Sequence, residues 1–434
     1  MDKMADVLGR AGAWCGQNKY LSAIKNAFQN FMPLTIAGAI GVLWCNVLVN
    51  ESTGLGIFFK PIMALEFLNP AFQAVNFCTI SCITVGITLG IAQEIGVWNM
   101  GAERAGYIPG LVGLAAWLSV TNTSHMVEGA KEAFTGIAGN ELGATGLFTG
   151  MIIGVLSVEL FCFFEKQDAL KIKMPEQVPP GVARAFEVLV PATITLIITA
   201  CIGSACYNLT GLYLNDVIKN GIQGPLGAVG ATIPGVMIIY LVIMLFWLVG
   251  IHGNNMLSAV KEALFTPLAL ENVEKFNKGE KPTNIINMYA LQMWGEFGGS
   301  GVTIGLVIAI MIFGKREDNK AIASLSLVPG LFNINETVTF GVPMVLNPIL
   351  GIPFVVAPLI TIIIGYVLTV IGFCPVACLT VPWTTPPLVF GFLATGANIM
   401  GAVTQAILIV VSTVIYTPFL IAYEKYQNKQ AAEV

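Results

Sequence analysis

Residues 321–423 contain one side chain that is charged or a histidine, the carboxylate of Glu336. Because 11% of the chain is charged, 103 residues of average composition would hold about eleven charged side chains. A stretch this poor in charge is typical of membrane-buried segments, where a carboxylate costs several kcal/mol unless it faces a polar cavity or a partner. Asn333 and Asn335 flank Glu336, so we expect this acid to receive a polar ligand.

The composition of the whole chain supports the membrane interpretation. Of its 434 residues, 56% are hydrophobic and 11% are charged, whereas soluble domains carry about 25% charged residues. The net charge of -4 argues against a nucleic-acid partner. Residues 1–14 are polar and contain no apolar core, which predicts that no signal peptide is removed. The nine cysteines lie mostly in apolar runs, where thiols behave as small hydrophobic side chains, so we expect no metal and no cofactor.

Apolar runs long enough to cross a membrane follow one another in the first half of the chain. A run of about 20 residues is needed to span a bilayer core of about 30 Å. An amphipathic helix over residues 15–31 is predicted to lie on the inner membrane surface before the first run. The predicted spans are Phe31–Asn50, Ala71–Gln93, Ile108–Val120, Leu142–Phe164, Val188–Asn215 and Ala231–Ile251.

The positions of Lys and Arg predict the orientation of the chain. Lys3, Arg10, Lys19 and Lys25 place the N-terminus on the cytoplasmic side, because cytoplasmic segments carry an excess of basic residues. Six spans return the chain to that side, where the segment Lys261–Lys281 looks soluble.

Another basic cluster, Lys315, Arg316 and Lys320, also looks cytoplasmic. The chain between the segment Lys261–Lys281 and this cluster, Asn284–Gly314, must therefore cross the membrane twice or not at all. It contains only one good apolar run, Phe297–Gly314. We therefore expect broken or re-entrant helices, which membranes tolerate where protein or a watery cavity covers the backbone.

Similar breaks are predicted further along. Ala321–Phe340 has Asn-Ile-Asn-Glu in its middle, ends before Pro343 and indicates a re-entrant hairpin, and Pro375–Phe392 is interrupted by prolines. Val345–Gly372 and Thr395–Ala422 are continuous runs, and the C-terminus is predicted to be cytoplasmic. The expected fold is all-α, with about ten transmembrane helices and re-entrant hairpins in the C-terminal half. Broken segments near the middle of the membrane are the best sequence indication of a transport site.

Four polar groups interrupt the apolar second half, at Trp247–Asn255, Gln292–Gly301, Asn333–Glu336 and Val381–Pro387. Each has an alternative interpretation. His252 could be a satisfied structural residue at a helix end, and the glycines of the second group could form a hinge. Glu336 could bond to backbone at a hairpin tip. Trp383 could anchor the chain at the membrane interface, or it could stack on a ligand.

Together these groups hold a carboxylate, amides, an imidazole and indoles. Sugars require that combination, because their hydroxyls hydrogen-bond with carboxylates and amides while a pyranose C–H face packs on an aromatic ring. The sequence has no Gly-Lys-Ser/Thr phosphate loop, so we expect no ATP hydrolysis by this chain. The predicted substrate-binding residues are Asn254, Asn333, Asn335, Trp383 and Thr384.

These stretches resemble the membrane component, enzyme IIC, of bacterial phosphotransferase sugar transporters in the lactose/cellobiose/diacetylchitobiose branch. The resemblance extends from about residue 8 to residue 422. The matching stretches are Asn30-Phe-Met-Pro-Leu34, Met174-Pro-Glu-Gln-Val-Pro-Pro180, Gly250-Ile-His-Gly253, Gly298-Gly-Ser-Gly-Val-Thr-Ile-Gly305, Leu331-Phe-Asn-Ile-Asn-Glu336, Gly341-Val-Pro-Met-Val-Leu-Asn-Pro348 and Val381-Pro-Trp-Thr-Thr-Pro386. The family pattern has proline after Asn-Ile-Asn-Glu, where this chain has Thr337.

The resemblance implies a bacterial inner-membrane permease for a disaccharide. It implies a homodimer, with residues 1–230 supplying the dimer-interface helices and residues 231–434 holding the sugar. His252 and Glu336 match the positions beside the sugar's reactive 6-hydroxyl and are the predicted catalytic residues. The phosphate would come from a phosphocysteine on a cytoplasmic enzyme IIB, which enzyme IIA charges, so this chain would be a phosphotransferase component only together with those partners. Membrane lipid is the remaining expected partner.

Two other functions fit a buried acid among broken helices. An ion-coupled secondary transporter would use Glu336 to carry a proton or bind sodium, and an uncoupler would abolish its uptake of unmodified sugar. A membrane transferase acting on lipid-linked sugars could use the same His252 and Glu336 without soluble phosphocarrier proteins.

Overall fold

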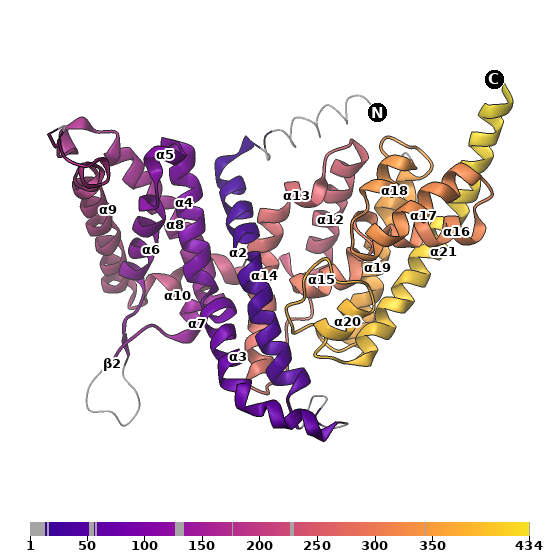
Figure 1. The fold of residues 1–434 in the computed structure, drawn as a ribbon, viewed down its shortest axis with the longest axis horizontal. Coiled ribbons are helices and arrows are strands. Elements are labelled where there is room, and N and C mark those ends of the chain that lie inside the picture. The colour runs from indigo at the N-terminus through magenta and orange to yellow at the C-terminus, as the bar shows by residue number, and fades with distance from the viewer. Residues whose placement is uncertain are drawn as a thin grey trace. The chain divides into compact units, whose positions relative to one another are not determined.

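A computed structural model describes Trp14, Gly56 and residues 17–51, 59–125, 134–175, 177–225, 230–342 and 344–433 (Figure 1). Residues 1–13, including Lys3 and Arg10, and Pro343 entered the sequence predictions and lie outside this described part. The chain forms two compact units. The N-terminal unit comprises Gln17–Gly38 and Val75–Ala228, and the C-terminal unit comprises Met1–Gly16, Ala39–Ala74 and Val229–Val434. The roles predicted for the halves 1–230 and 231–434 stay predictions.

Helices make up most of the described structure, which confirms the predicted all-α class. Within the described residues, the strands are limited to β1 (Ser124–His125) and β2 (Phe134–Thr135), paired antiparallel with Ser124 opposite Thr135. By length and apolar composition, five described segments could cross a membrane: Lys19–Leu48, Ala144–Glu165, Pro180–Thr210, Gly351–Val370 and Ile399–Lys429. Two bent pairs could raise the count to seven, and two shorter apolar helices accompany them.

The N-terminal unit is built from α4 (Ile83–Met100), α6 (Ile108–Val120), α8 (Ala144–Glu165) and α9 (Pro180–Thr210). Close contact between α4 and α8 depends on Gly150, because a Cβ there would lie 2.2 Å from the Thr88 Oγ1 atom. The shorter elements of the unit are α5 (Ala102–Ala105), α7 (Gly139–Leu142), η5 (Asp168–Leu170), α10 (Leu214–Ile218) and η6 (Lys219–Gln223).

The first helix differs from the prediction. A surface helix over 15–31 followed by a separate span was expected, but α2 runs without interruption over Lys19–Leu43 and passes through Pro33. A π-helical turn, η1 (Trp44–Leu48), extends it. The predicted span over 71–93 is instead interrupted. It begins within α3 (Asn69–Asn76), which follows η3 (Lys60–Leu68), passes through the π-helical turn η4 (Phe77–Ser81) and enters α4 after a 42° bend.

From Ile233 onward, the described part of the C-terminal unit contains ten α-helices. They are α12 (Ile233–Leu248), α13 (Gly253–Met256), α14 (Ser258–Asn277), α15 (Met288–Gly295), α16 (Ile304–Phe313), α17 (Glu317–Leu331), α18 (Glu336–Gly341), α19 (Gly351–Val370), α20 (Val389–Ala394) and α21 (Ile399–Glu433), with the 3-10 turn η7 (Ser300–Val302) before α16. The long helices α19 and α21 pack together, and α21 also contacts α16 and α20. Buried Glu424 on α21 accepts hydrogen bonds from the backbone N–H groups of Lys315 and Arg316, so the loop before α17 is tied to α21.

Breaks in these helices occur where the polar groups predicted them. α15 with η7 meets α16 at a bend of 59°, a geometry that fits either a broken span or a re-entrant loop. Asn333 has φ +63° in the turn between α17 and α18, so the predicted hairpin is a helix–turn–helix. The chain from 371 to 388 forms no helix, and α20 begins only at Val389. Four breaks, at residues 249–252, 296–303, 332–335 and 371–388, therefore lie in this one unit.

Candidate sugar site

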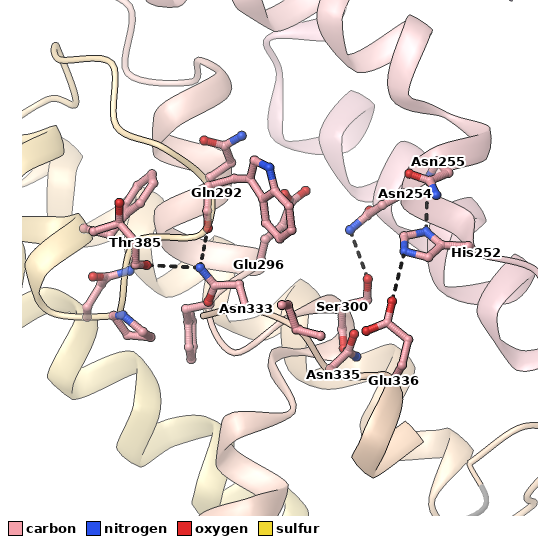
Figure 2. A pocket seen from close by; sticks show the side chains of 17 residues that line it. His252, Asn254, Asn255, Gln292, Glu296, Ser300, Asn333, Asn335, Glu336 and Thr385 are labelled. Atoms are coloured by element: carbon pink, nitrogen blue, oxygen red, sulfur yellow. Dashed lines mark hydrogen bonds and ion pairs between the residues drawn. The ribbon is translucent and has the colours of Figure 1, made fainter. Parts of the chain in front are cut away.

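The four breaks of the C-terminal unit surround a cavity of about 200 Å³ (Figure 2). Its lining is polar at many positions although the surrounding helices are apolar. The lining residues are His252, Asn254, Asn255, Gln292, Glu296, Phe297, Gly299, Ser300, Asn333, Ile334, Asn335, Glu336, Trp383, Thr385, Pro387, Phe390 and Gln405. Tertiary structure therefore brings together all four polar groups, whose lining residues extend from His252 to Pro387 in the sequence.

His252 lies at the break between α12 and α13 and is held in one orientation. Its Nδ1 atom accepts a hydrogen bond of 3.2 Å from the backbone N–H of Asn255, and its ring packs 4.4 Å from that of buried Trp247. Because Nδ1 is an acceptor, a neutral His252 carries its proton on Nε2. Nε2 lies 3.8 Å from the Oε1 atom of Glu336. That distance is too long for a direct hydrogen bond, but one hydroxyl oxygen placed beside the pair, about 2.8 Å from each atom, could bond to both.

Glu336 is the first residue of α18, and its side chain is 47% exposed. Asn335, which precedes it, is buried and donates from Nδ2 to the backbone oxygen of Ser300 (2.8 Å) and to Thr339 Oγ1 (3.1 Å). Gly299 passes so close to Asn335 that a Cβ on the glycine would lie 2.6 Å from the Asn335 side chain. Asn335 therefore holds Glu336 against the turn at Ser300, and its predicted contact with substrate stays a prediction.

Asn333 joins three of the breaks through a single side chain. Its Oδ1 atom accepts a 2.6 Å hydrogen bond from the backbone N–H of Gly298, and its Nδ2 donates to the backbone oxygens of Trp383 and Thr385. All of its hydrogen-bonding groups are thus engaged by protein. Asn333 positions the cavity walls directly, whereas its predicted contact with substrate stays a prediction.

Two amide oxygens in the cavity wall have no protein partner. Asn254 donates from Nδ2 to Ser300 Oγ (3.0 Å), but its Oδ1 is buried and accepts no hydrogen bond from the protein. The Oε1 atom of Gln292 is in the same situation. Buried polar atoms are nearly always hydrogen-bonded, so we expect each oxygen to accept a hydrogen bond from a water or from a ligand hydroxyl.

The loop from residue 381 to residue 387 contributes an aromatic side chain. Trp383 lines the cavity and is 45% exposed, which leaves the indole available to a ligand. Thr384, a predicted substrate-binding residue, is not among the lining residues, and its neighbour Thr385 is. The two threonines are adjacent in a turn, and nothing in the sequence distinguishes them.

Several cavity residues had not been singled out from the sequence. Glu296 accepts a 2.7 Å hydrogen bond from the buried Tyr240 hydroxyl and forms an ion pair with Lys261. Lys261 had been assigned to a soluble-looking segment, yet it is buried. Gln405 lies in an uncharged run of α21, where nothing in the sequence marks it. Its Oε1 accepts from the backbone N–H groups of Leu388 and Gly391, at 2.8 and 2.7 Å.

The cavity has two chemically different ends (Figure 2). His252, Asn254 and Glu336 lie at one end, and Gln292, Glu296 and Thr385 lie at the other. An imidazole, a carboxylate and free amide oxygens, with an exposed indole beside them, match the needs of a sugar's hydroxyls and C–H face. Fold and site together define a helical membrane protein with a carbohydrate-type cavity among broken helices.

Comparison with known proteins identifies the family. The model of the family "Phosphotransferase system, EIIC" matches residues 25–358, more than half of the chain. The oligo-beta-mannoside-specific EIIC component of Bacillus subtilis is 33% identical over 429 residues, covering 98% of this chain and 94% of that protein. The cellobiose-specific EIIC component of Lactococcus lactis is 30% identical, covering 98% of each.

A solved structure agrees with these relatives. The transporter ChbC, the IIC component from the N,N'-diacetylchitobiose-specific phosphotransferase system, matches with a TM-score of 0.88 and 30% identity over 97% of each chain. The chain belongs to the phosphotransferase system EIIC family, which confirms the resemblance seen in the sequence. It is a membrane sugar permease component of such a system, and this function is favoured over ion-coupled transport.

Proposed function

We propose that this permease binds a disaccharide in the cavity, translocates it and presents its 6-hydroxyl for phosphorylation. The phosphoryl group comes from a phosphocysteine on enzyme IIB, which enzyme IIA recharges. Support comes from the specificities of the relatives, which are oligo-beta-mannoside, cellobiose and N,N'-diacetylchitobiose. These sugars share linked pyranose rings, which suits a cavity with two polar ends.

The observation that carries the proposal is the placement of His252 Nε2 and Glu336 Oε1, which lie 3.8 Å apart on the wall of one cavity. A 6-hydroxyl beside this pair receives a hydrogen bond from His252 and donates its own to Glu336. As the hydroxyl oxygen bonds to phosphorus, the sulfur–phosphorus bond of the donor breaks and the hydroxyl proton passes to Glu336. Phosphoryl transfer depends mainly on positioning, and a well-placed base contributes about 10²–10⁴-fold.

The second ring of the disaccharide is assigned to the other end of the cavity. There the exposed indole of Trp383 packs on the C–H face of a pyranose, and the buried Gln292 Oε1 accepts a hydroxyl hydrogen. Asn254 Oδ1 accepts a further hydroxyl hydrogen near His252.

The membrane arrangement is part of the same proposal. The chain works as a homodimer in the bacterial inner membrane, with about ten spans, cytoplasmic termini and lipid around the spans. Residues 1–230 provide the dimer-interface helices, and residues 231–434 bind the sugar. Basic residues in the loops that follow even-numbered spans support this orientation.

The test separates sugar binding from phosphoryl transfer. Glu336→Gln keeps the shape of the side chain but removes the base, so phosphorylation by phospho-enzyme IIB should fall at least about 100-fold. His252→Ala should weaken both sugar binding and transfer. Glu317→Gln is the matched control, because Glu317 is an 87% exposed carboxylate on the neighbouring helix α17. Wild-type transfer rates in both site variants would contradict the roles of Glu336 and His252. Uptake of unmodified sugar that stops with an uncoupler would instead support ion coupling.

A further inference from the structure

The described side chains that line the cavity include acidic groups but no lysine or arginine. Among the described residues, the ionisable side chains of the lining are the carboxylates of Glu296 and Glu336 and the imidazole of His252. The nearest cation that contacts a lining side chain is Lys261, which lies behind the wall rather than in it.

The two carboxylates differ in how their charge is compensated. Glu296 pairs with buried Lys261 and also accepts a hydrogen bond from Tyr240, so its negative charge is largely offset. Glu336 is 47% exposed, and its nearest ionisable partner is His252 at 3.8 Å. The end of the cavity at Glu336 therefore carries an uncompensated negative charge whenever His252 is neutral.

The buried wall atoms that lack a protein partner favour a ligand that brings hydrogen-bond donors over one that brings acceptors. The Oδ1 atom of Asn254 and the Oε1 atom of Gln292 are buried acceptors that lack donors. Sugar hydroxyls can supply those donors, whereas a phosphate monoester offers mainly acceptor oxygens. A phosphate also carries a charge of about -1.5 to -2 at pH 7, which Glu336 repels at close range.

We propose that the cavity selects the neutral sugar against its own phosphorylated product, and that Glu336 determines this selectivity. The inference rests on the proposed function. Once Glu336 has released the proton that it accepted from the hydroxyl, the new phosphate lies beside the one uncompensated carboxylate, so chemistry converts a ligand that the cavity holds into a ligand that it repels. This repulsion favours release of the product, and release then needs no coupling to the movement of a cation.

The position of the phosphate should matter as much as its charge. A phosphate on the ring at the far end of the cavity lies near Glu296, whose charge Lys261 offsets. That isomer should be disfavoured less than the isomer phosphorylated beside Glu336. A general exclusion of anions by the cavity would penalise both isomers equally.

The experiment compares affinities of the purified, full-length permease by calorimetry. Cellobiose, lactose, mannobiose and diacetylchitobiose are tested first, and the tightest-binding sugar is then compared with its ester phosphorylated on the 6-hydroxyl of the non-reducing ring. Wild type should bind the neutral sugar at least about tenfold more tightly than the ester, a ratio that a single like-charge contact in a partly wet site can produce. Glu336→Gln should reduce that ratio at least about fivefold by the same argument, and the control Glu317→Gln should leave it unchanged.

A second measurement needs no variant. Raising NaCl from about 0.05 to 0.5 M shortens the Debye length, so the wild-type ratio should fall toward one through tighter binding of the ester. Equal affinities for sugar and ester in wild type, or a ratio that neither salt nor Glu336→Gln alters, would overturn the selectivity while leaving the proposed function standing. Failure of all four neutral sugars to bind would overturn the proposed function and this inference with it.

Discussion

Replacing Lys261 with methionine tests how the cavity wall is stabilised. Lys261 is 7% exposed and Glu296 is 16% exposed, so the substitution leaves a largely buried carboxylate without its cation. Breaking a buried ion pair by removing one partner costs about 3–5 kcal/mol, because the remaining charge stays desolvated. The Tyr240 hydroxyl still donates a hydrogen bond to Glu296, so the loss in the free energy of unfolding should lie toward the lower end of that range.

Thermal unfolding in detergent measures this cost. A loss of about 3 kcal/mol should lower the melting temperature by about 6 °C or more for a unit of this size. The double variant Lys261→Met with Glu296→Gln removes both charges, so it should recover more than half of the lost stability. An exposed pair, Glu317 with Lys320, provides the control: Lys320→Met should change the free energy of unfolding by less than about 1 kcal/mol.

Either of two results would contradict the stabilising role of the Lys261 charge. A melting temperature of Lys261→Met equal to that of wild type would show that the Lys261 charge does not stabilise Glu296. A double variant less stable than Lys261→Met would show that the stability lost came from packing of the lysine stem and not from charge.

Two other substitutions test how the breaks are held together. Asn333→Ala removes hydrogen bonds to Gly298 and to the backbone of Trp383 and Thr385, so it should destabilise the protein by about 1–3 kcal/mol and weaken sugar binding. Melting temperature and calorimetry check it, and an unchanged affinity would contradict the positioning role. Gly301→Ala should prevent stable folding, because Gly301 has φ +79° and a Cβ there would lie 2.3 Å from the Phe354 ring. Size-exclusion chromatography in detergent should show loss of the monodisperse protein, and a well-behaved, wild-type-like variant would refute the steric argument.

The positions of the helix breaks were predictable because polar residues in a membrane need a polar environment. The group at Asn333–Glu336 marked the turn between α17 and α18, and the group at Gln292–Gly301 marked the 59° bend. Each conclusion followed from the cost of burying a polar group in lipid, which depends on residue type and not on the neighbours.

Other features escaped the sequence because they depend on distant partners. The uncharged run that begins at Phe31 suggested a boundary near residue 31, yet α2 continues through it. Lys261 looked soluble because its partner Glu296 lies 35 positions away, across a helix break. Gln405 looked like one polar residue in an apolar helix until its contacts with the start of α20 and with Met293 were seen.

The sequence alone was enough to predict that Glu336 faces a polar group. A single acid in 103 residues had to face a polar ligand or a partner, because its solvation energy allows little else in that setting. Only the tertiary structure decided which residues accompany it. His252 lies 84 positions earlier in the chain, and its distance of 3.8 Å from Glu336 depends on where the fold places the residue before α13 and the first residue of α18. The Asn333 side chain forms hydrogen bonds that join the walls of the cavity. The sequence could not indicate these partners, because hydrogen-bond pairing depends on three-dimensional neighbours and not on residue type.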